Sequence, residues 1–443
     1  MNQPANQLPA SNNARRVASV DVLRGLTILL MVFVNDLGQS APAWMHHIQP
    51  PDADGMTLAD IVFPFFLFIA GVSIPLAFDA ARRRGESNCR ILGHILSRTL
   101  ALILMGLIEV NRQNDVLLGP ELWGLLAFVS IICAWCIVPR TPGRRRNVFL
   151  ALKMLGIVGV VILFAMFRSQ ATETDVLFFG HVTEWTWIRT QWWGILGLIG
   201  WAYLVAASVY FLLAIGGGRP RPEWLMAAVA MLILMFLASK QGGFFVRVAD
   251  KTWLEPLLPV VASLESVVEF VNRHVDLGTQ LGSLPSIMMA GCILGSVLLH
   301  GSEIESAGQR VRWSLTFAAI LFLLGLMTDT FAGINKISAT PTWCLWCAAM
   351  ATLVWVVLYW VIDIRQWSAW TILVRPAGAN PLIAYLMHPI LLFVLSLTGL
   401  GTVVRSYADS PTSLVAMAGS LAMALFVCGF TGLIAKCGLR IRV

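Results

Sequence analysis

Charged residues are scarce in this chain, and their scarcity excludes an ordinary soluble globular protein. Only 12% of the 443 residues are Asp, Glu, Lys or Arg, whereas 58% are hydrophobic. The mean hydropathy of +0.76 is typical of proteins whose chain crosses a membrane many times. We therefore expect one membrane-embedded unit without a separate soluble domain.

The N-terminal segment lacks the apolar stretch that a secretory signal peptide requires. Residues 1–14 are rich in Asn, Gln, Pro and Ser instead. We expect residues 1–18 to be a disordered cytoplasmic tail and residues 19–443 to form a single transmembrane domain.

The chain also lacks a convincing metal-binding motif. Cys344 and Cys347 have the C-x-x-C spacing, but they lie in an apolar stretch between Trp343 and Trp346. No second Cys or His pair is near them in the sequence, so a helix surface is favoured over a metal or redox site. We expect no metal ion.

Long apolar stretches are abundant, and a transmembrane helix needs about 20 such residues. They predict an all-α, polytopic transmembrane helix bundle of about 11–12 spans. The region between residues 240 and 280 is ambiguous, because 253–260 and 261–271 could be interfacial helices or a re-entrant segment. The predicted spans are 20–36, 57–78, 92–110, 121–139, 147–167, 191–214, 222–239, 281–299, 312–328, 342–362, 378–398 and 412–435.

The distribution of charge predicts the orientation of these spans. Cytoplasmic loops of membrane proteins are enriched in Lys and Arg, which also explains the net charge of +7 without a nucleic-acid partner. With both termini in the cytoplasm, every even-numbered loop is basic and the odd-numbered loops carry acids as well. The basic loops hold Arg82–Arg84 with Arg90, Arg140 with Arg144–Arg146, Arg219 with Arg221, Arg310 with Arg312, and Arg365.

Polar residues gather at the mouth of the first two spans, on the predicted outer face. Asn35 ends the first span, His46 and His47 lie in the loop, and Asp60 opens the second span. A histidine can take a proton or carry an acyl group, and an amide can stabilise an oxyanion. Asp60 could orient a histidine. Equally, these could be solvated loop residues, a helix cap and a carboxylate favoured by the helix dipole.

The first span links the two faces of the membrane. Arg24 lies near its cytoplasmic start, eleven residues before Asn35, which is about 17 Å on a helix. Arg24 and Arg375 could hold phosphate groups of a donor from the cytoplasm. Asn380, in a span interrupted by Gly378 and Pro381, could border the donor channel.

Several short motifs follow one another in a fixed order. They are S-V-D-V-L-R-G at 19–25, M-V-F-V-N at 31–35, the histidine loop, and L-A-D-I-V-F-P at 58–64. I-N-K at 334–336, Y-W-V-I-D at 359–363 and G-A-N-P-L-I-A-Y at 378–385 follow later. In this order they resemble the heparan-α-glucosaminide N-acetyltransferase family; between about 110 and 280 the likeness is one of hydropathy only.

This resemblance implies a transmembrane acyltransferase domain. It implies transfer of an acetyl group from cytoplasmic acetyl-CoA to an amino sugar, or a sugar hydroxyl, on the periplasmic side of the inner membrane. A loop histidine and Asn35 would form the reaction centre. His47, three residues after Trp44, fits better than His46. Asn335 and Lys336 lie in an outer loop; they could reach the acceptor sugar or close the site, or equally be ordinary polar loop residues.

The sequence leaves other points open. It does not identify the acceptor, and it does not decide between direct transfer and an acetyl-histidine intermediate. Membrane lipids are expected partners, and the resemblance is compatible with a homodimer. A multi-pass transporter of a sugar-linked or small organic substrate is the alternative function; it predicts ionisable residues near the bilayer centre and internal repeats, and no convincing repeat is visible.

Overall fold

The fold is seen in a computed structural model. It describes residues 17–112, 117–169, 174–176, 180–182, 187–189, 191–192, 194–216, 218–240, 256, 259, 263, 266, 271–272, 275–299, 301–302 and 304–441. The predicted N-terminal tail lies outside the described residues, apart from residues 17 and 18. So does most of the ambiguous region from 240 to 280.

The predicted all-α bundle is confirmed. Within the described ranges, ten helical segments are long and apolar enough to cross a membrane, and two shorter apolar helices occupy the remaining predicted spans. The long segments are α1 (Ala18–Asp36), α2 (Leu58–Arg83), α3 (Asn88–Asn111), α5 (Arg144–Met166), α6 (Ile195–Ala214), α7 (Pro222–Lys240), α10 (Leu284–Val297) with the preceding turn Thr279–Ser283, α11 (Ala307–Ala332), α12 (Pro341–Leu358) continued by Tyr359–Ile364, and α16 (Ser413–Lys436).

The remaining elements are short. The two shorter apolar helices are α4 (Pro120–Ala134) and α14 (Pro381–Leu397). The others are 3-10 turns at Ala43–Met45 and Ala369–Leu373, α13 (Arg375–Ala379), α15 (Gly401–Val404), and the antiparallel strands β1 (Thr174–Val176) and β2 (Gly180–Val182).

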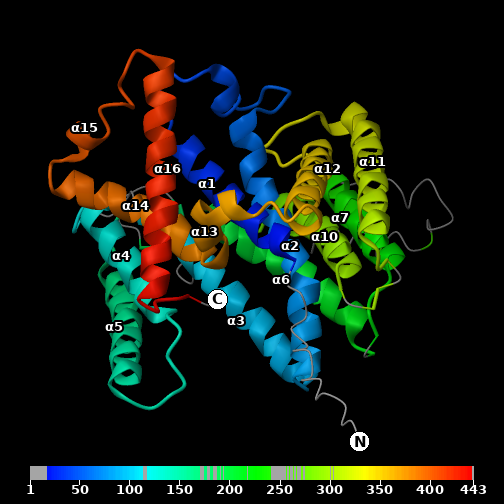
Figure 1. Ribbon diagram of the computed structural model, residues 1–443, viewed down its shortest axis with the longest axis horizontal. Coiled ribbons are helices and arrows are strands. Elements are labelled where there is room, and N and C mark those ends of the chain that lie inside the picture. Colours follow the sequence, from blue (N-terminus) through cyan, green and yellow to red (C-terminus); the bar gives the residue numbers. More distant parts are fainter. Residues whose placement is uncertain are drawn as a thin grey trace, which may run out of the picture.

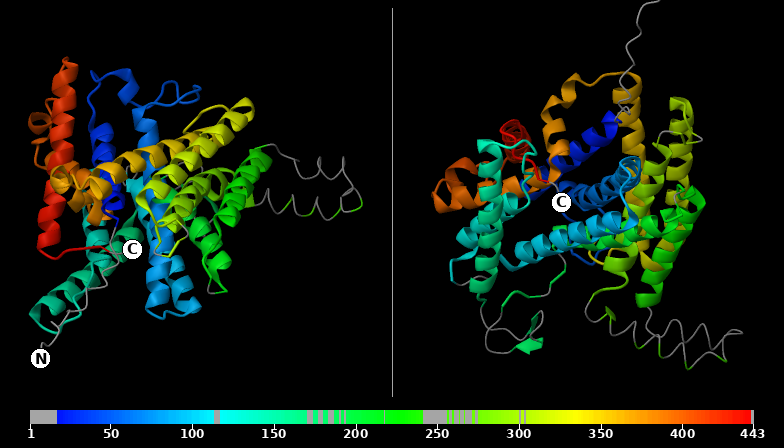
Figure 2. Two further views of the ribbon diagram at one scale, coloured as in Figure 1. Left: turned by 45° about the vertical axis from the view of Figure 1, so that its right-hand side comes forward. Right: turned by 90° about the horizontal axis from the view of Figure 1, so that it is seen from below.

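Helices α1 and α2 occupy the centre of the molecule (Figure 1). The α4–α5 hairpin lies on one flank, and α10, α11 and α12 lie on the opposite flank (Figure 2). Helices α13 and α16 pack against α1, and α10 packs along α2. The first two helices therefore contact both halves of the bundle, which places the motif-bearing segment in the interior.

Glycines allow the closest of these contacts. A side chain at Gly71 of α2 would overlap the carbonyl of Met288 in α10, and one at Gly291 of α10 would overlap the carbonyl of Phe68 in α2. Small residues let the backbones of membrane helices approach closely. This increases the van der Waals contacts between the helices, which matter because the hydrophobic effect does not drive helix association within lipid. The α2–α10 contact therefore depends on these two positions.

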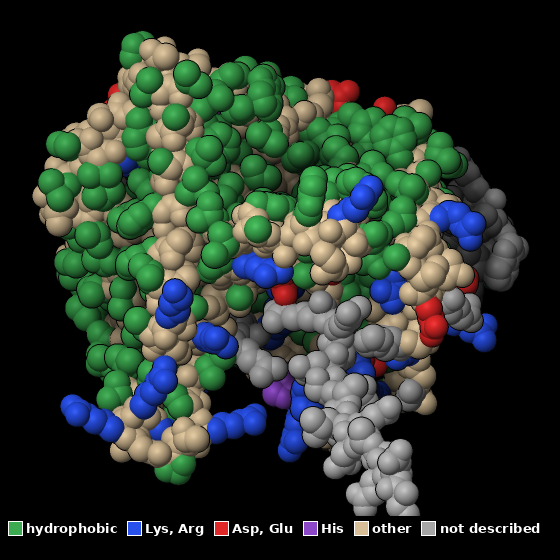
Figure 3. All heavy atoms as spheres, viewed as in Figure 1, with side chains coloured by type: hydrophobic (Ala, Val, Ile, Leu, Met, Phe, Trp, Pro, Cys, Tyr) green, Lys and Arg blue, Asp and Glu red, His purple; other side chains and the backbone are tan. Residues whose placement is uncertain are grey.

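The two ends of the bundle differ in charge. The loop between α1 and α2 lies at one end, and the α2–α3 and α4–α5 connections lie at the other (Figure 1). Lys and Arg side chains gather over the half that holds these connections (Figure 3). Arg82 and Arg83 end α2, and Arg144, Arg145 and Arg146 begin α5. This asymmetry is what the charge pattern of the loops predicts.

Candidate active site

The pair formed by His47 and Asp60 is the centre of the candidate site. Nδ1 of His47 lies 2.8 Å from Oδ1 of Asp60. Oδ2 of Asp60 accepts hydrogen bonds from the backbone NH of Ile48 (3.1 Å), from the backbone NH of Thr57 (3.1 Å) and from the Thr57 hydroxyl (2.9 Å). Thr57 precedes α2 and Asp60 is in its first turn, so the capping arrangement and the helix dipole both stabilise the carboxylate there.

The geometry assigns different roles to the two groups. Asp60 is 1% exposed, whereas the side chain of His47 is 49% exposed. A carboxylate beside Nδ1 favours the tautomer that carries its proton on that nitrogen, and Nε2 is then left with a lone pair. His47 can therefore present a base or a nucleophile on the accessible side of the loop.

Lys336 completes the cluster from a distant part of the chain. Its Nζ lies 3.0 Å from Nδ1 and 3.4 Å from Nε2 of His47, and 3.7 Å from Oδ1 of Asp60. Burial lowers the pKa of Lys336, and the charge of Asp60 opposes this shift. The structure thus brings together His47, Asp60 and Lys336, three residues that the sequence placed in two separate loops.

Asn335 holds these two loops together. Its side-chain amide donates to the carbonyls of Pro51 (2.9 Å) and Ala53 (3.2 Å). The neighbouring Ile334 donates its backbone NH to Asp54 (2.7 Å) and accepts from the NH of Gly55 (2.8 Å). The amide of Asn335 is therefore hydrogen-bonded to the first loop, and this contact positions Lys336 beside His47.

His46 has a different setting from His47. Its side chain is partly buried, and its Nε2 has no hydrogen-bond partner among the described residues. Its carbonyl accepts a hydrogen bond from the Thr57 hydroxyl. The backbone carbonyl of His46 thus helps to fix the loop, whereas the ring of His47 contacts the carboxylate of Asp60.

Asn35 is exposed at the last turn of α1, and the next residue, Asp36, is fully buried. Asp36 accepts a hydrogen bond from the Tyr407 hydroxyl, and its Oδ1 lies 3.1 Å from Arg405 and 3.5 Å from Nε2 of His388. Sequence reasoning missed this cluster. The available signal was a carboxylate at a span end, where an uncompensated charge is costly.

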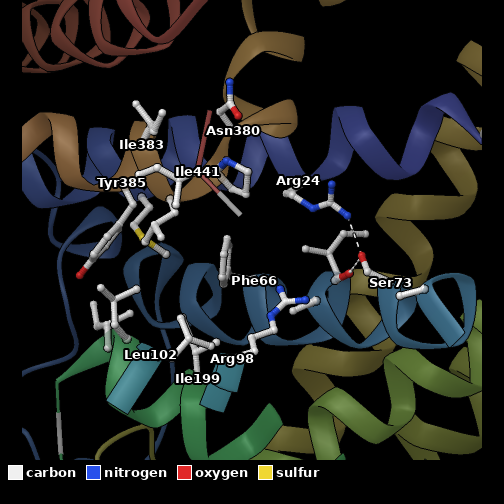
Figure 4. Close-up of a pocket in the computed structure, with 18 residues that line it drawn as sticks. Arg24, Phe66, Ser73, Arg98, Leu102, Ile199, Asn380, Ile383, Tyr385 and Ile441 are labelled. Carbon is white, nitrogen blue, oxygen red and sulfur yellow. Dashed lines mark hydrogen bonds between the residues drawn. The ribbon is translucent and has the colours of Figure 1, made fainter. Parts of the chain in front are cut away.

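A cavity of about 480 Å³ opens between α1, α2, α3, α6 and α14 (Figure 4). Arg24 lines it and donates to the Ser73 hydroxyl (2.6 Å), the Gly378 carbonyl (3.2 Å) and Asp21 (3.2 Å). Asn380 is buried and also lines this cavity. Arg375 is exposed and is not among its lining residues.

Two ionisable residues inside α3 were also missed by sequence reasoning. Arg98 lines the cavity, and Glu109 accepts hydrogen bonds from the Tyr385 hydroxyl and from the backbone NH of Leu196 (3.5 Å). Both lie within an apolar span, and an ionisable residue there is a functional candidate by default. Tyr385 lines the cavity too, so both residues are tied to it. No group of three or more potential metal ligands occurs among the described residues.

These observations define a multi-pass, all-α membrane protein with an imidazole–carboxylate pair at one face and a cationic cavity in its interior. The chain is similar to curated heparan-α-glucosaminide N-acetyltransferases. It is 28% identical to the Mus musculus protein in an alignment of 398 residues, and the match covers 86% of this chain and 54% of the relative. It is 26% identical to the Homo sapiens protein in an alignment of 400 residues, and that match covers 85% of this chain and 53% of the relative.

The chain therefore spans about half the length of the curated relatives it matches. Residues 16–183 also match a family described as a domain of unknown function (DUF5009). The resemblance indicated by the sequence motifs is confirmed over most of the chain, including the middle region, where only hydropathy had suggested it.

Proposed function

We propose that this protein is a transmembrane acetyltransferase that passes an acetyl group from acetyl-CoA to an amino sugar. The observation that carries the proposal is the His47–Asp60 pair, whose imidazole is accessible at one mouth of the bundle, together with a cavity in the interior lined by Arg24 and Arg98. The names of the relatives in mouse and human support acetyl as the transferred group and an amino sugar as its acceptor. A sugar hydroxyl is the alternative acceptor.

His47 would act as the general base. Its Nε2 takes a proton from the acceptor amine as the nitrogen attacks the thioester carbonyl. The C–N bond forms, the C–S bond breaks, and the proton passes from His47 to the departing thiolate. Asp60 stabilises the imidazolium through Nδ1, and the Asn35 amide would stabilise the oxyanion. In the two-step alternative, Nε2 itself carries the acetyl group to the acceptor.

The donor would enter through the cavity from the basic end. Arg24 and Asn380 line the cavity, and Met31, also a lining residue, lies seven residues beyond Arg24 on α1, about 10 Å along the helix. Asn35 is one further turn along. The volume of about 480 Å³ is in the range of small-molecule sites. Arg375, exposed near the same end, would contact the outermost part of the donor.

The acceptor would bind at the opposite mouth. Lys336 lies beside His47 and could bind a hydroxyl or carboxylate of the sugar, while Asn335 keeps the two loops together. By the positive-inside rule both termini and the cavity entrance are cytoplasmic, and the His47 loop faces the periplasm across the inner membrane.

The test uses the purified chain in detergent, with acetyl-CoA labelled in the acetyl group and glucosamine as the acceptor. We expect N-acetylglucosamine from the wild type. His47→Ala should lower turnover about 10²–10⁴-fold, the usual contribution of a positioned proton-transfer group. His46→Ala is the matched control and should retain most activity. Undiminished transfer by the His46/His47 double alanine variant would refute the imidazole mechanism.

A transporter remains the second candidate, because Arg98 and Glu109 lie inside a span as transport would require. The same assay separates the two functions. A transporter moves its substrate without consuming acetyl-CoA, so uptake of labelled glucosamine into proteoliposomes, with no acetylated product, would favour transport.

A further inference from the structure

Arg98 occupies an unusual position for an arginine. It lies ten residues after the start of α3, about 15 Å along the helix. It lines the cavity together with Arg24 and Ser73 (Figure 4). Its guanidinium stands over the ring of Tyr203 in α6, with its carbon atom 4.6 Å from the ring centre. Arg98 therefore lies at the cavity against α6, and it is partly buried there.

The charge of Arg98 is incompletely satisfied. Its Nε is buried and has no hydrogen-bond partner among the described residues, and none of the described residues lining the cavity is acidic. The aromatic ring offers a cation–π contact, but it cannot replace the lost hydrogen bonds of water. A partly buried guanidinium with one buried, unpartnered nitrogen is stabilised by an anion.

Arg24 provides a second guanidinium in the same cavity. In Figure 4 the two arginines approach from opposite walls, Arg24 from α1 and Arg98 from α3, toward the part of the cavity beside Ser73. Asp21 offsets part of the charge of Arg24 at 3.2 Å. This end of the cavity is therefore net positive.

The rest of the cavity is largely apolar. Met31, Leu102, Ile195, Ile199 and Ile383 line it. A ligand that fits both parts carries its negative charge at one end and a neutral, flexible arm at the other. Phosphate suits the charged end, because its oxygens accept two hydrogen bonds from a planar guanidinium.

We propose that Arg98, with Arg24, binds a phosphate group of the thioester donor and makes the enzyme selective for phosphate-bearing donors. This inference rests on the proposed acetyltransferase function. Tyr203 holds the guanidinium of Arg98 in place from α6. Arg98 is thus a specificity-determining residue, whereas the reacting atoms lie beyond the apolar part of the cavity.

The test measures the affinities of coenzyme A and of pantetheine, which lacks the phosphates, by calorimetry on detergent-purified protein. Arg98→Gln should weaken coenzyme A binding about 10–100-fold, the range of one lost charge-assisted contact, and leave pantetheine binding unchanged. Arg98→Lys keeps the charge but loses the planar guanidinium, so it should lose less coenzyme A affinity than Arg98→Gln. If the glutamine variant does not fold, the coenzyme A affinity of Arg98→Lys tests the proposal. Arg90→Gln, an exposed arginine on the same helix, is the control and should bind as the wild type.

The outcomes separate this inference from the proposed function. If wild type acetylates glucosamine while Arg98→Gln binds coenzyme A as tightly as wild type, Arg98 is not a donor residue and only this inference fails. If coenzyme A binds in an Arg98-dependent way without any acetyl transfer, only the proposed function fails. If wild type does not bind coenzyme A, both fail.

An anionic lipid headgroup is the other source of phosphate. The same measurements in nanodiscs of pure phosphatidylcholine, and in nanodiscs with phosphatidylglycerol added, distinguish it. Loss of phosphatidylglycerol retention in Arg98→Gln with coenzyme A affinity unchanged would assign the site to a lipid and overturn the proposal.

Discussion

The imidazole of His47 depends on residues that do not react. Asp60 holds Nδ1, and Thr57 and the Ile48 backbone hold Asp60 in turn. Lys336 lies within 3.4 Å of both ring nitrogens. The proposed base is therefore positioned by a buried carboxylate and lies beside a lysine from another loop.

Asn35 allows a prediction at this scale. Asn35→Ala should lower acetyl transfer about 10²–10³-fold if its amide stabilises the oxyanion, and coenzyme A affinity should not change because the amide acts only at the acetyl end. Turnover and calorimetry on the same preparation provide the measurement. Asn147→Ala, at an exposed position of α5, is the control. A turnover in Asn35→Ala equal to that of this control would remove Asn35 from the reaction centre.

At the scale of elements, α1 connects the proposed donor cavity to the acceptor mouth. Its first half packs against α13, and Gly25 meets the carbonyl of Val374, the residue before α13, so closely that no side chain fits. Its last turn is fixed by Asp36, which contacts residues of α14 and of the segment after α15. Asn35 is thereby held between two anchored ends of one rigid helix.

The anchor at Asp36 should be measurable as stability. Asp36→Asn removes the carboxylate that the partly exposed Arg405 contacts, and losing such a charge-assisted hydrogen bond costs about 1.5–3 kcal/mol. We expect a clearly lower melting temperature in detergent, together with lower acetyl transfer because the end of α1 loosens. Asp409→Asn, an exposed carboxylate in the same segment, should melt as the wild type. Equal melting of both variants would show that Asp36 is not an anchor.

At the scale of the whole molecule, the proposal requires two different faces. The histidine loop and the loop that carries Lys336 lie at one end of the bundle, and the basic loops lie at the other. A donor and an acceptor can then approach from opposite sides and meet without crossing each other.

Sidedness can be measured directly. A cysteine introduced at Gln39, which is exposed in the first loop, should react with a membrane-impermeant maleimide in intact spheroplasts. The exposed native Cys89 and Cys437 lie at the basic end and should react only after lysis, so they serve as internal controls. The reverse pattern would invert the orientation and with it the proposed direction of transfer.

Hydropathy was sufficient to predict the bundle. Each of the twelve predicted spans coincides with a helix, because the membrane requires long apolar segments whose backbone hydrogen bonds are satisfied internally. The sequence also predicted the short-range features of the candidate site. Thr57, Asp60 and the histidines lie within one loop and one helix start, where chain proximity limits the available arrangements.

Contacts between distant segments were decided only by the tertiary structure. Lys336 reaches His47 across 289 residues of chain, and Arg405 reaches Asp36 across 369 residues. Hydropathy assigns a segment to the membrane but says nothing of which helices are neighbours. The surroundings of Arg98 and Glu109 could not be predicted for the same reason, because they depend on α6 and α14, which pack around these two residues. The sequence by itself thus determined the spans, the family resemblance and the loop of the candidate site, whereas helix packing decided which charges share a cavity.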